Sequence, residues 1–128
     1  MRKVLLDASF ILTLASKPLN LMEELEEMLG KVELLVLEDT MKELEAISKR
    51  PSIKKSKQAR LALDFVMRLE HITYAQKGSV DDKILKCAME NKLIVATIDK
   101  ELRKRLRSMR LSVITLKENR LMMNGARI

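Results

Sequence analysis

The sequence predicts an α/β fold: three layers, α/β/α, with a central parallel sheet of about five strands. Two observations carry this prediction. Short apolar runs of the kind found in buried strands alternate with amphipathic stretches of helical period along all 128 residues. No repeat, low-complexity run or linker interrupts the alternation, and the length suits a single domain, residues 1–128. Ligands of such sheets bind outside the carboxyl ends of the strands, so chemistry is expected there.

The first strand and the two helices after it are delimited by clear boundary residues. Residues 4–6 form an apolar run that ends in Asp7, which is typical of a strand buried on both faces. Residues 9–17 and 19–29 have helical period and are separated by Pro18. In the second of these helices the apolar side chains form one stripe opposite four glutamates, and a glycine ends the helix.

The middle of the chain repeats the pattern. Residues 33–37 are the next apolar strand, and a helix is predicted over 40–49. Thr40 and Glu43 have the spacing of a capping box, which marks a helix start. A proline then interrupts the chain before a longer helix over residues 54–69.

The last part completes the alternation. Strands are predicted over residues 71–74, 93–97 and 111–116, which are short and rich in Ile, Val, Leu and Thr. Helices are predicted over 80–91 and 99–109, where apolar residues recur at helical spacing. Covering both faces of the sheet with these helices gives the three layers.

Composition excludes most cofactor chemistry. The single Cys87 rules out an internal disulfide framework, the single His71 rules out multi-histidine metal sites, and three scattered glycines form no phosphate loop. Apolar runs are far shorter than the roughly 20 residues of a membrane span, so no membrane partner is expected. The first strand leaves no room for a signal peptide, which predicts a cytoplasmic protein.

Acidic residues collect at the predicted strand-to-helix junctions. These residues are Asp7, Glu43, Asp81, Asp82 and Asp99. Each has a structural explanation, since carboxylates cap helix N-termini and interact favourably with the helix dipole. Acids at four separate junctions exceed what capping requires, and crowded carboxylates need a counter-cation. Oxygen ligands favour Mg²⁺ or Mn²⁺, so the five are predicted as catalytic and metal-binding residues.

Two finer predictions concern neighbours of these acids. On a helix over 80–91, Asp81 falls near the middle of the inward face and Asp82 near its boundary. Asp81 is therefore predicted as the direct ligand, and Asp82 as a cap, a supporting group or a ligand of a second metal. Ser9 and Thr97 are caps by default, or hydroxyls that orient a carboxylate or a water molecule.

The net charge of +7 predicts a polyanionic partner. Two basic clusters flank the acids along the chain, and a phosphodiester backbone fits this pattern better than two solvated helix faces do. The predicted RNA-binding residues are Lys54, Lys55, Lys57, Lys100, Arg103, Lys104 and Arg107. Only three aromatic residues are present, which disfavours base-stacking platforms.

Residues 4–10, 41–45, 81–85 and 95–102 together resemble the PIN-domain ribonucleases in order and spacing. Residues 77–82, 94–97 and 102–107 resemble most the branch that holds the small-subunit ribosomal RNA-processing nucleases and their archaeal relatives. Residues 8–9 are Ala-Ser where many relatives have Thr-Asn or Thr-Ser.

The resemblance implies a metal-dependent endoribonuclease that acts on ribosomal RNA precursors, and frequent homodimers. Two alternatives stay open. One is a VapC-type toxin controlled by an antitoxin partner, and the other is a non-catalytic RNA-binding factor in ribosome assembly.

Overall fold

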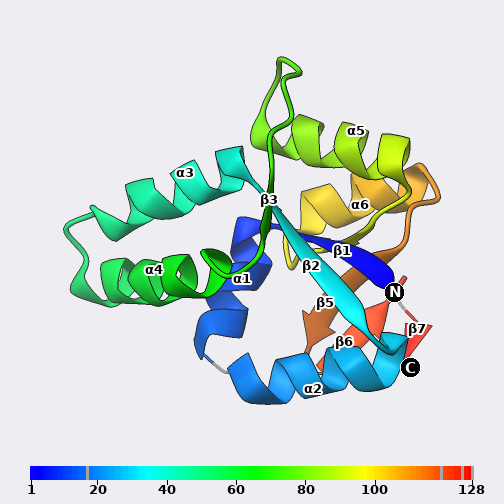
Figure 1. The fold of residues 1–128 in the computed structure, drawn as a ribbon, viewed down its shortest axis with the longest axis horizontal. Coiled ribbons are helices and arrows are strands. Elements are labelled where there is room, and N and C mark those ends of the chain that lie inside the picture. The colour runs from blue at the N-terminus through cyan, green and yellow to red at the C-terminus, as the bar shows by residue number, and fades with distance from the viewer. Residues whose placement is uncertain (17, 119, 125, 128) are drawn as a thin grey trace.

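The computed structural model describes the chain except residues 17, 119, 125 and 128, and it confirms the predicted three-layer α/β/α class (Figure 1). In this described part, seven strands form one sheet in the order β3-β2-β1-β4-β5-β6-β7. The strands are β1 (Arg2–Leu6), β2 (Val32–Leu37), β3 (Glu70–Ile72), β4 (Ile94–Ala96), β5 (Val113–Lys117), β6 (Arg120–Met123) and β7 (Ala126–Arg127). The helices are α1 (Ala8–Ser16), α2 (Pro18–Leu29), α3 (Glu38–Ser48), α4 (Ile53–Val66), α5 (Val80–Asn91) and α6 (Lys100–Ser108).

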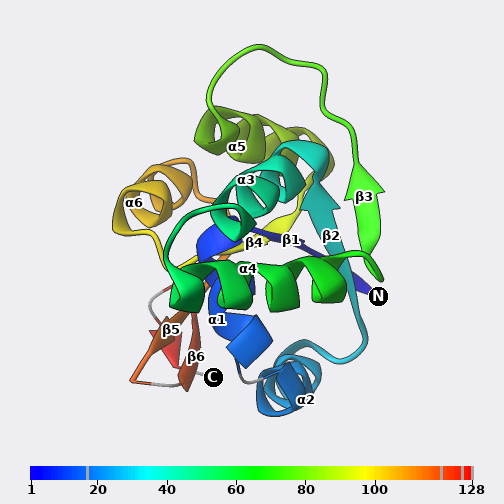
Figure 2. The same ribbon diagram turned by 90° about the vertical axis from the view of Figure 1, so that its left-hand side faces the viewer.

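Alternation along the strands produces the two cores. In β1, Val4 and Leu6 face one way and join a core that is filled from α1, α2, α3 and α4, while Leu5 faces the other way and packs with α5 and α6. Figure 2 shows the two layers on either side of the sheet, with α5 and α6 together and α4, α1 and α2 on the opposite side. Both faces of the central strands are buried, as the continuous apolar runs predict.

The strand order places β1 and β4 side by side in the middle of the sheet. Strands β1 to β5 pair in parallel, and Leu6 of β1 lies opposite Ala96 of β4. The chain leaves β1 for β2 and β3 on one side and returns to β4 on the other. The carboxyl ends of β1 and β4 therefore form the switch point of the sheet, where open α/β sheets bind their ligands.

Most predicted boundaries differ from the observed ones by one to three residues, and two of the differences have an identifiable reason. The predicted helix over 9–17 is α1, and Lys17 lies outside the described residues. Pro18 is the first residue of α2 rather than a spacer, which suits a residue without a backbone N–H. The capping box at Thr40 is wrong: α3 begins at Glu38, its N-cap is Leu37, and Thr40 is buried. Glu43 accordingly lies in the second turn of α3.

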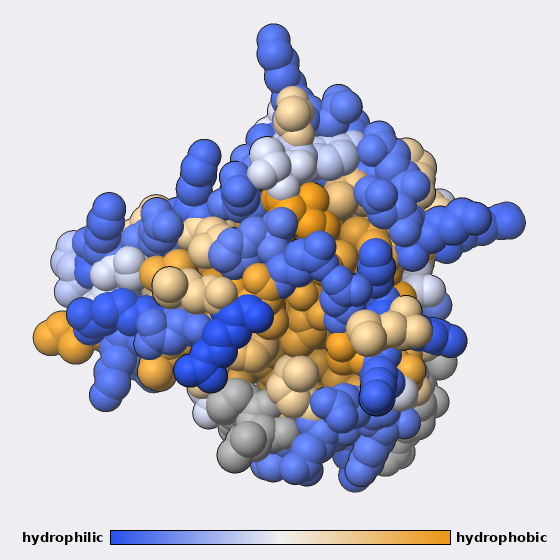
Figure 3. Space-filling model, viewed as in Figure 1, coloured by the Kyte–Doolittle hydropathy of each residue, from blue (hydrophilic) through white to orange (hydrophobic). Residues whose placement is uncertain are grey.

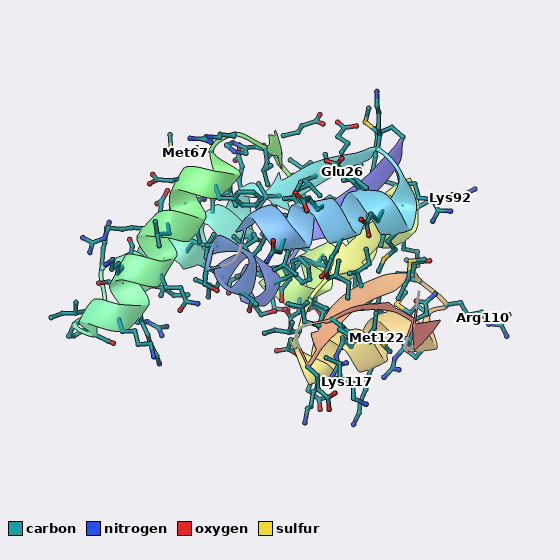
Figure 4. All side chains as sticks on the ribbon, turned by 90° about the horizontal axis from the view of Figure 1, so that it is seen from below. Glu26, Met67, Lys92, Arg110, Lys117 and Met122 are labelled. Atoms are coloured by element: carbon teal, nitrogen blue, oxygen red, sulfur yellow. The ribbon has the colours of Figure 1, made fainter. Side chains whose placement is uncertain are left out.

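The two C-terminal strands were not predicted from the sequence. β6 and β7 extend the parallel sheet with antiparallel pairs, and Leu121 of β6 is buried against the first core. The residues of β6 include two methionines, which favour helices over strands, so no local signal marks the strand. Figure 4 shows β6 with Met122 beside the end of β5 at Lys117, with α2 and its exposed Glu26 lying across the sheet.

The surface is mainly hydrophilic outside a central area. On the face seen in Figure 1, hydrophobic side chains are visible in the middle, and hydrophilic ones predominate around them, with a further hydrophobic spot at the projecting end of α3 and α4 (Figure 3). Helices α3 and α4 project together beyond the sheet on one side (Figure 1). None of the described helices is both long and apolar enough to cross a membrane.

Candidate active site

Asp7 is the best-defined member of the acidic group. It follows β1 directly, its backbone N–H donates to the carbonyl of Ala96 at 2.9 Å, and only 6% of the residue is exposed. Its Oδ2 accepts hydrogen bonds from Ser9 Oγ and Thr97 Oγ1, both at 2.7 Å. Within the described residues Oδ1 has no hydrogen-bond partner, so one oxygen of a nearly buried carboxylate remains available.

Ser9 and Thr97 connect Asp7 to the loop after β4. Each hydroxyl has a single proton, and each donates it in a 2.7 Å hydrogen bond to Asp7 Oδ2. Their oxygens then accept backbone N–H groups at 3.1 Å, from Ile98 for Ser9 and from Asp99 for Thr97. The prediction that these hydroxyls orient a carboxylate therefore has a geometric basis, because both touch Asp7.

The other predicted acids reach the same edge from three helices. Glu43 comes from the second turn of α3, Asp81 from the first turn of α5, and Asp99 is the N-cap of α6, where its Oδ1 accepts the N–H of Leu102 at 2.9 Å. The charges of Asp7 and Asp99 act on Asp81, and those of Asp7 and Asp81 act on Glu43. The fold thus gathers four of the five predicted acids around the switch point.

Carboxylate crowding is visible in the pKa values. Desolvation, followed by the charges of Asp7, Asp81 and Asp39, raises the pKa of Glu43 to about 7. The residue as a whole is exposed, so solvent reduces the energetic effect of this shift. Desolvation and the neighbouring acids also raise the pKa of Asp81, against the lowering effect of Arg105. A cation at this edge of the sheet would oppose both shifts.

The donor atoms suit a divalent cation, but the described side chains are not arranged as a finished metal site. The donor set contains only carboxylate and hydroxyl oxygens, which is what Mg²⁺ and Mn²⁺ prefer. Among the side chains that the structure describes, no three His, Cys, Asp or Glu residues gather closely enough to hold a metal ion as they stand. The acids therefore act on one another through their charges without forming a closed ligand cage.

Asp82 points to a different partner. Its Oδ1 pairs with Arg105 Nη2 of α6 at 2.5 Å, and Ser79, the N-cap of α5, accepts the Asp82 backbone N–H at 3.1 Å. The hydrogen bond from Arg105 lowers the pKa of Asp82. The two adjacent acids thus differ in environment, with Asp81 facing the other carboxylates and Asp82 bound to a cation.

A second ion pair joins α3 to α5. Lys83 Nζ donates to Asp39 Oδ2 at 2.7 Å, and this bond lowers the pKa of Asp39. Together with the Asp82–Arg105 pair it ties the first turn of α5 to both neighbouring helices. Neither pair was predictable from the sequence, because the partners are 44 and 23 residues apart and no local pattern links them.

The predicted RNA-binding residues lie on helices of opposite layers. The first cluster, Lys54, Lys55 and Lys57, is exposed at the start of α4, at the free end of the projecting α3–α4 pair (Figure 1). Lys100, Lys104 and Arg107 are exposed on α6. Arg103 differs: it is half-buried, and its enclosed Nε has no hydrogen-bond partner among the described residues.

Two hollows lie away from the acids. One is lined by Arg2, Lys92 and Ile94 among others, and the next by Lys3, Glu70 and Ile72 among others. Both include residues at the start of β1 and at the end of α5, so they lie toward the amino-terminal end of β1, away from the acids at its carboxyl end. They contain none of the predicted site residues, so the acidic group is the better-supported functional site.

The raised pKa of Glu43 predicts how metal-free protein responds to pH. Between the ordinary value of 4.5 and about 7, the folded chain binds more protons than the unfolded chain, so stability falls as pH rises through this window. Glu43→Gln removes that cost. With solvent screening taken into account, we expect the variant to gain about 1 kcal/mol over wild type at about pH 8 and almost nothing at about pH 4.

Urea unfolding in EDTA at the two pH values measures this difference. Glu45→Gln, on the same helix, is the matched control. Equal gains at both pH values would show that the effect is not electrostatic.

A mostly parallel sheet between two layers of helices, with carboxylates at its switch point, defines the class: an α/β protein with an acidic, oxygen-donor site. The chain belongs to the PIN-like domain family, whose model, described as "PIN like domain", matches residues 4–119. That span contains every predicted acid. The sequence resemblance to PIN domains is therefore confirmed.

Similar proteins support the assignment. Ribonuclease VapC4 of Methanocaldococcus jannaschii is 32% identical over 124 residues, which cover 94% of each chain. The solved PIN domain endonuclease Utp24 matches in fold with a TM-score of 0.78 at 24% identity, covering 98% of this chain and 95% of that one. VapBC2 from Rickettsia felis, solved with a fragment of promoter DNA, matches with a TM-score of 0.62 at 18% identity, covering 90% and 99%.

Proposed function

We propose that this protein is a Mg²⁺- or Mn²⁺-dependent endoribonuclease. The observation that carries the proposal is the gathering of Asp7, Glu43, Asp81 and Asp99 at one edge of the sheet, with mutual repulsion that contributes to the raised pKa of two of them. A bound divalent cation would relieve that repulsion. The family and the ribonuclease relative support the same reaction class.

The chain's own residues have separable roles in this proposal. Asp7, held by Ser9 and Thr97, would supply the central ligand oxygen, and Glu43, Asp81 and Asp99 would complete the site. When bound, a divalent cation neutralises the scissile phosphate and activates water for in-line attack. The exposed lysines and arginines of α4 and α6 would bind the RNA backbone.

We propose ribosomal RNA precursor as the substrate, on the resemblance of residues 77–82, 94–97 and 102–107 to the ribosomal RNA-processing branch. Identity to Ribonuclease VapC4 favours a second candidate, a toxin ribonuclease restrained by an antitoxin. The purified protein should be incubated with ribosomal RNA precursor, transfer RNA and messenger RNA, each with Mg²⁺, Mn²⁺ or EDTA.

Discrete, EDTA-sensitive cleavage of the ribosomal precursor alone would support the first candidate. Selective cleavage of transfer or messenger RNA, inhibited by a small partner encoded beside the gene, would support the toxin. RNA binding without cleavage in any metal would overturn both candidates in favour of a non-catalytic assembly factor. We also propose a homodimer, which light scattering of the purified chain tests.

The basic face of α6 makes RNA affinity salt-dependent. Replacing Lys104 and Arg107 with alanine is expected to flatten the log–log dependence of affinity on salt by roughly 0.7 for each phosphate that is no longer neutralised. These two are chosen over Arg103 because they are exposed, so their replacement leaves packing intact. Fluorescence anisotropy across a salt series measures the slope.

The paired change Lys31→Ala with Arg68→Ala removes the same charge from exposed positions away from α6 and serves as the control. An unchanged slope in the α6 variant would place RNA binding elsewhere.

A further inference from the structure

We propose that Arg105 is a phosphate-binding residue of the acidic site and that Asp82 positions it. This inference rests on the proposed ribonuclease function and assigns a substrate contact within it. It also gives Asp82 a role other than metal ligation.

Arg105 lies close to the acidic group. Its guanidinium bridges from α6 to Asp82 at the start of α5, with Nη2 2.5 Å from Oδ1. Asp81, the residue before Asp82, faces Asp7 and Asp99, and the charge of Arg105 reaches it. The guanidinium therefore lies on the Asp81 side of the acidic group, and we place a phosphate of the bound RNA strand there.

Arg105 also has spare hydrogen-bonding capacity. A guanidinium has five N–H donors, and in the described part of the chain Asp82 is the only side chain that it bonds. The side chain is 46% exposed. The planar guanidinium can donate two parallel hydrogen bonds to two oxygens of a phosphodiester. A lysine cannot make this bidentate contact.

Asp82 is itself held in place. Ser79 caps its backbone N–H, and Gly78 lies against its side chain with a φ of +132°. A Cβ at position 78 would stand 3.2 Å from both Cβ and Oδ2 of Asp82. Glycine thus meets the backbone requirement and leaves room for the carboxylate that orients Arg105.

Stability alone explains the pair poorly. Both partners are well exposed, at 46% and 39% of their side chains, and ion pairs of this kind contribute little to folding. Arg103, which precedes Arg105 on α6, is not equivalent, because its Nε is enclosed. Arg105 combines a fixed orientation with free donors, which is the combination that specific phosphate recognition requires.

The test compares Arg105→Gln, Arg105→Lys and Asp82→Asn with Arg68→Gln, an exposed arginine just beyond the end of α4. Cleavage kinetics give KM and kcat, anisotropy in EDTA gives RNA affinity, and calorimetry gives Mn²⁺ affinity. Arg105→Gln is expected to raise KM about tenfold and weaken RNA binding in parallel, with Mn²⁺ affinity held. Arg105→Lys should recover part of the affinity, because it keeps the charge without the fork.

Asp82→Asn is expected to weaken RNA binding in the same direction by a smaller factor. The double variant Asp82→Asn with Arg105→Gln should match Arg105→Gln alone, since Asp82 acts through the arginine. RNA affinity and KM that equal those of Arg68→Gln would overturn the proposal. A drop in Mn²⁺ affinity specific to Asp82→Asn would also overturn it, because Asp82 would then be a ligand.

Failure of the proposed ribonuclease function can be distinguished from failure of the Arg105 assignment. A wild-type protein that never cleaves RNA refutes the ribonuclease function, while the RNA affinities in EDTA still test Arg105. Thermal unfolding of each variant identifies effects that arise from folding: if Arg105→Gln unfolds early, Arg105→Lys, which keeps the long side chain and its charge, decides.

Discussion

Asp7→Asn is expected to reduce RNA cleavage by about 10³-fold or more while the protein stays folded and still binds RNA. Asparagine has the shape of aspartate, and its carbonyl oxygen can accept the hydroxyl protons of Ser9 and Thr97 that Oδ2 now accepts. What it lacks is the charge. A central ligand oxygen of a divalent cation must carry that charge, so the chemistry fails and the framework remains.

The measurement is single-turnover cleavage at saturating Mg²⁺, with Mn²⁺ affinity and circular dichroism on the same preparation. Asp64→Asn removes the same charge from an exposed position on α4 and is the matched control. Undiminished cleavage by Asp7→Asn would refute the metal hypothesis. A variant that unfolds would leave Asp7 with a structural role and would need Asp7→Ser to separate the two effects.

Asp81→Asn is expected to lose far more activity than Asp82→Asn, although the two residues are adjacent. Asp81 faces Asp7 and Asp99, and desolvation with these charges raises its pKa. Asp82 instead pairs with Arg105, which lowers its pKa. We expect roughly a 10²-fold difference in kcat between the variants, since only one of them removes a ligand oxygen.

Cleavage rate and Mn²⁺ affinity, measured side by side, decide the order of the two variants. A larger loss in Asp82→Asn, with both proteins folded, would make Asp82 the ligand and would contradict the assignment from the helix face. Metal-free Asp81→Asn should also be the more stable variant near neutral pH, because it relieves repulsion that costs the folded state.

Periodicity in the sequence was enough to predict the fold class and the order of the first five strands along the chain. Strand alternation of Val4, Leu5 and Leu6 and the caps at Ser79 and Asp99 depend on residues within a few positions of one another. Local interactions of this kind can be recognised without knowledge of the rest of the fold. The same logic failed at Thr40, because α3 begins directly where β2 ends and carries the threonine into the core.

The acidic group and its convergence on one edge of the sheet were also predictable, since its members follow strands, but the side-chain contacts within it were not. Asp7 and Thr97 are 90 residues apart, and they touch because β4 pairs with β1 rather than with β3. Strand order is set by long-range packing, which no local pattern records. The β6–β7 extension is likewise set by long-range packing, because Leu121 of β6 is buried in the first core.

The sequence by itself determined an α/β domain with a basic surface and acids at its strand ends. Only the tertiary structure decided which acids act on one another and which acid pairs with a basic side chain. Helical period placed Asp81 inward, but the partner of Asp82 is Arg105, 23 residues away on the next helix. Side chains at helix boundaries are oriented by the neighbours that happen to pack beside them, and those neighbours are chosen by the folded topology.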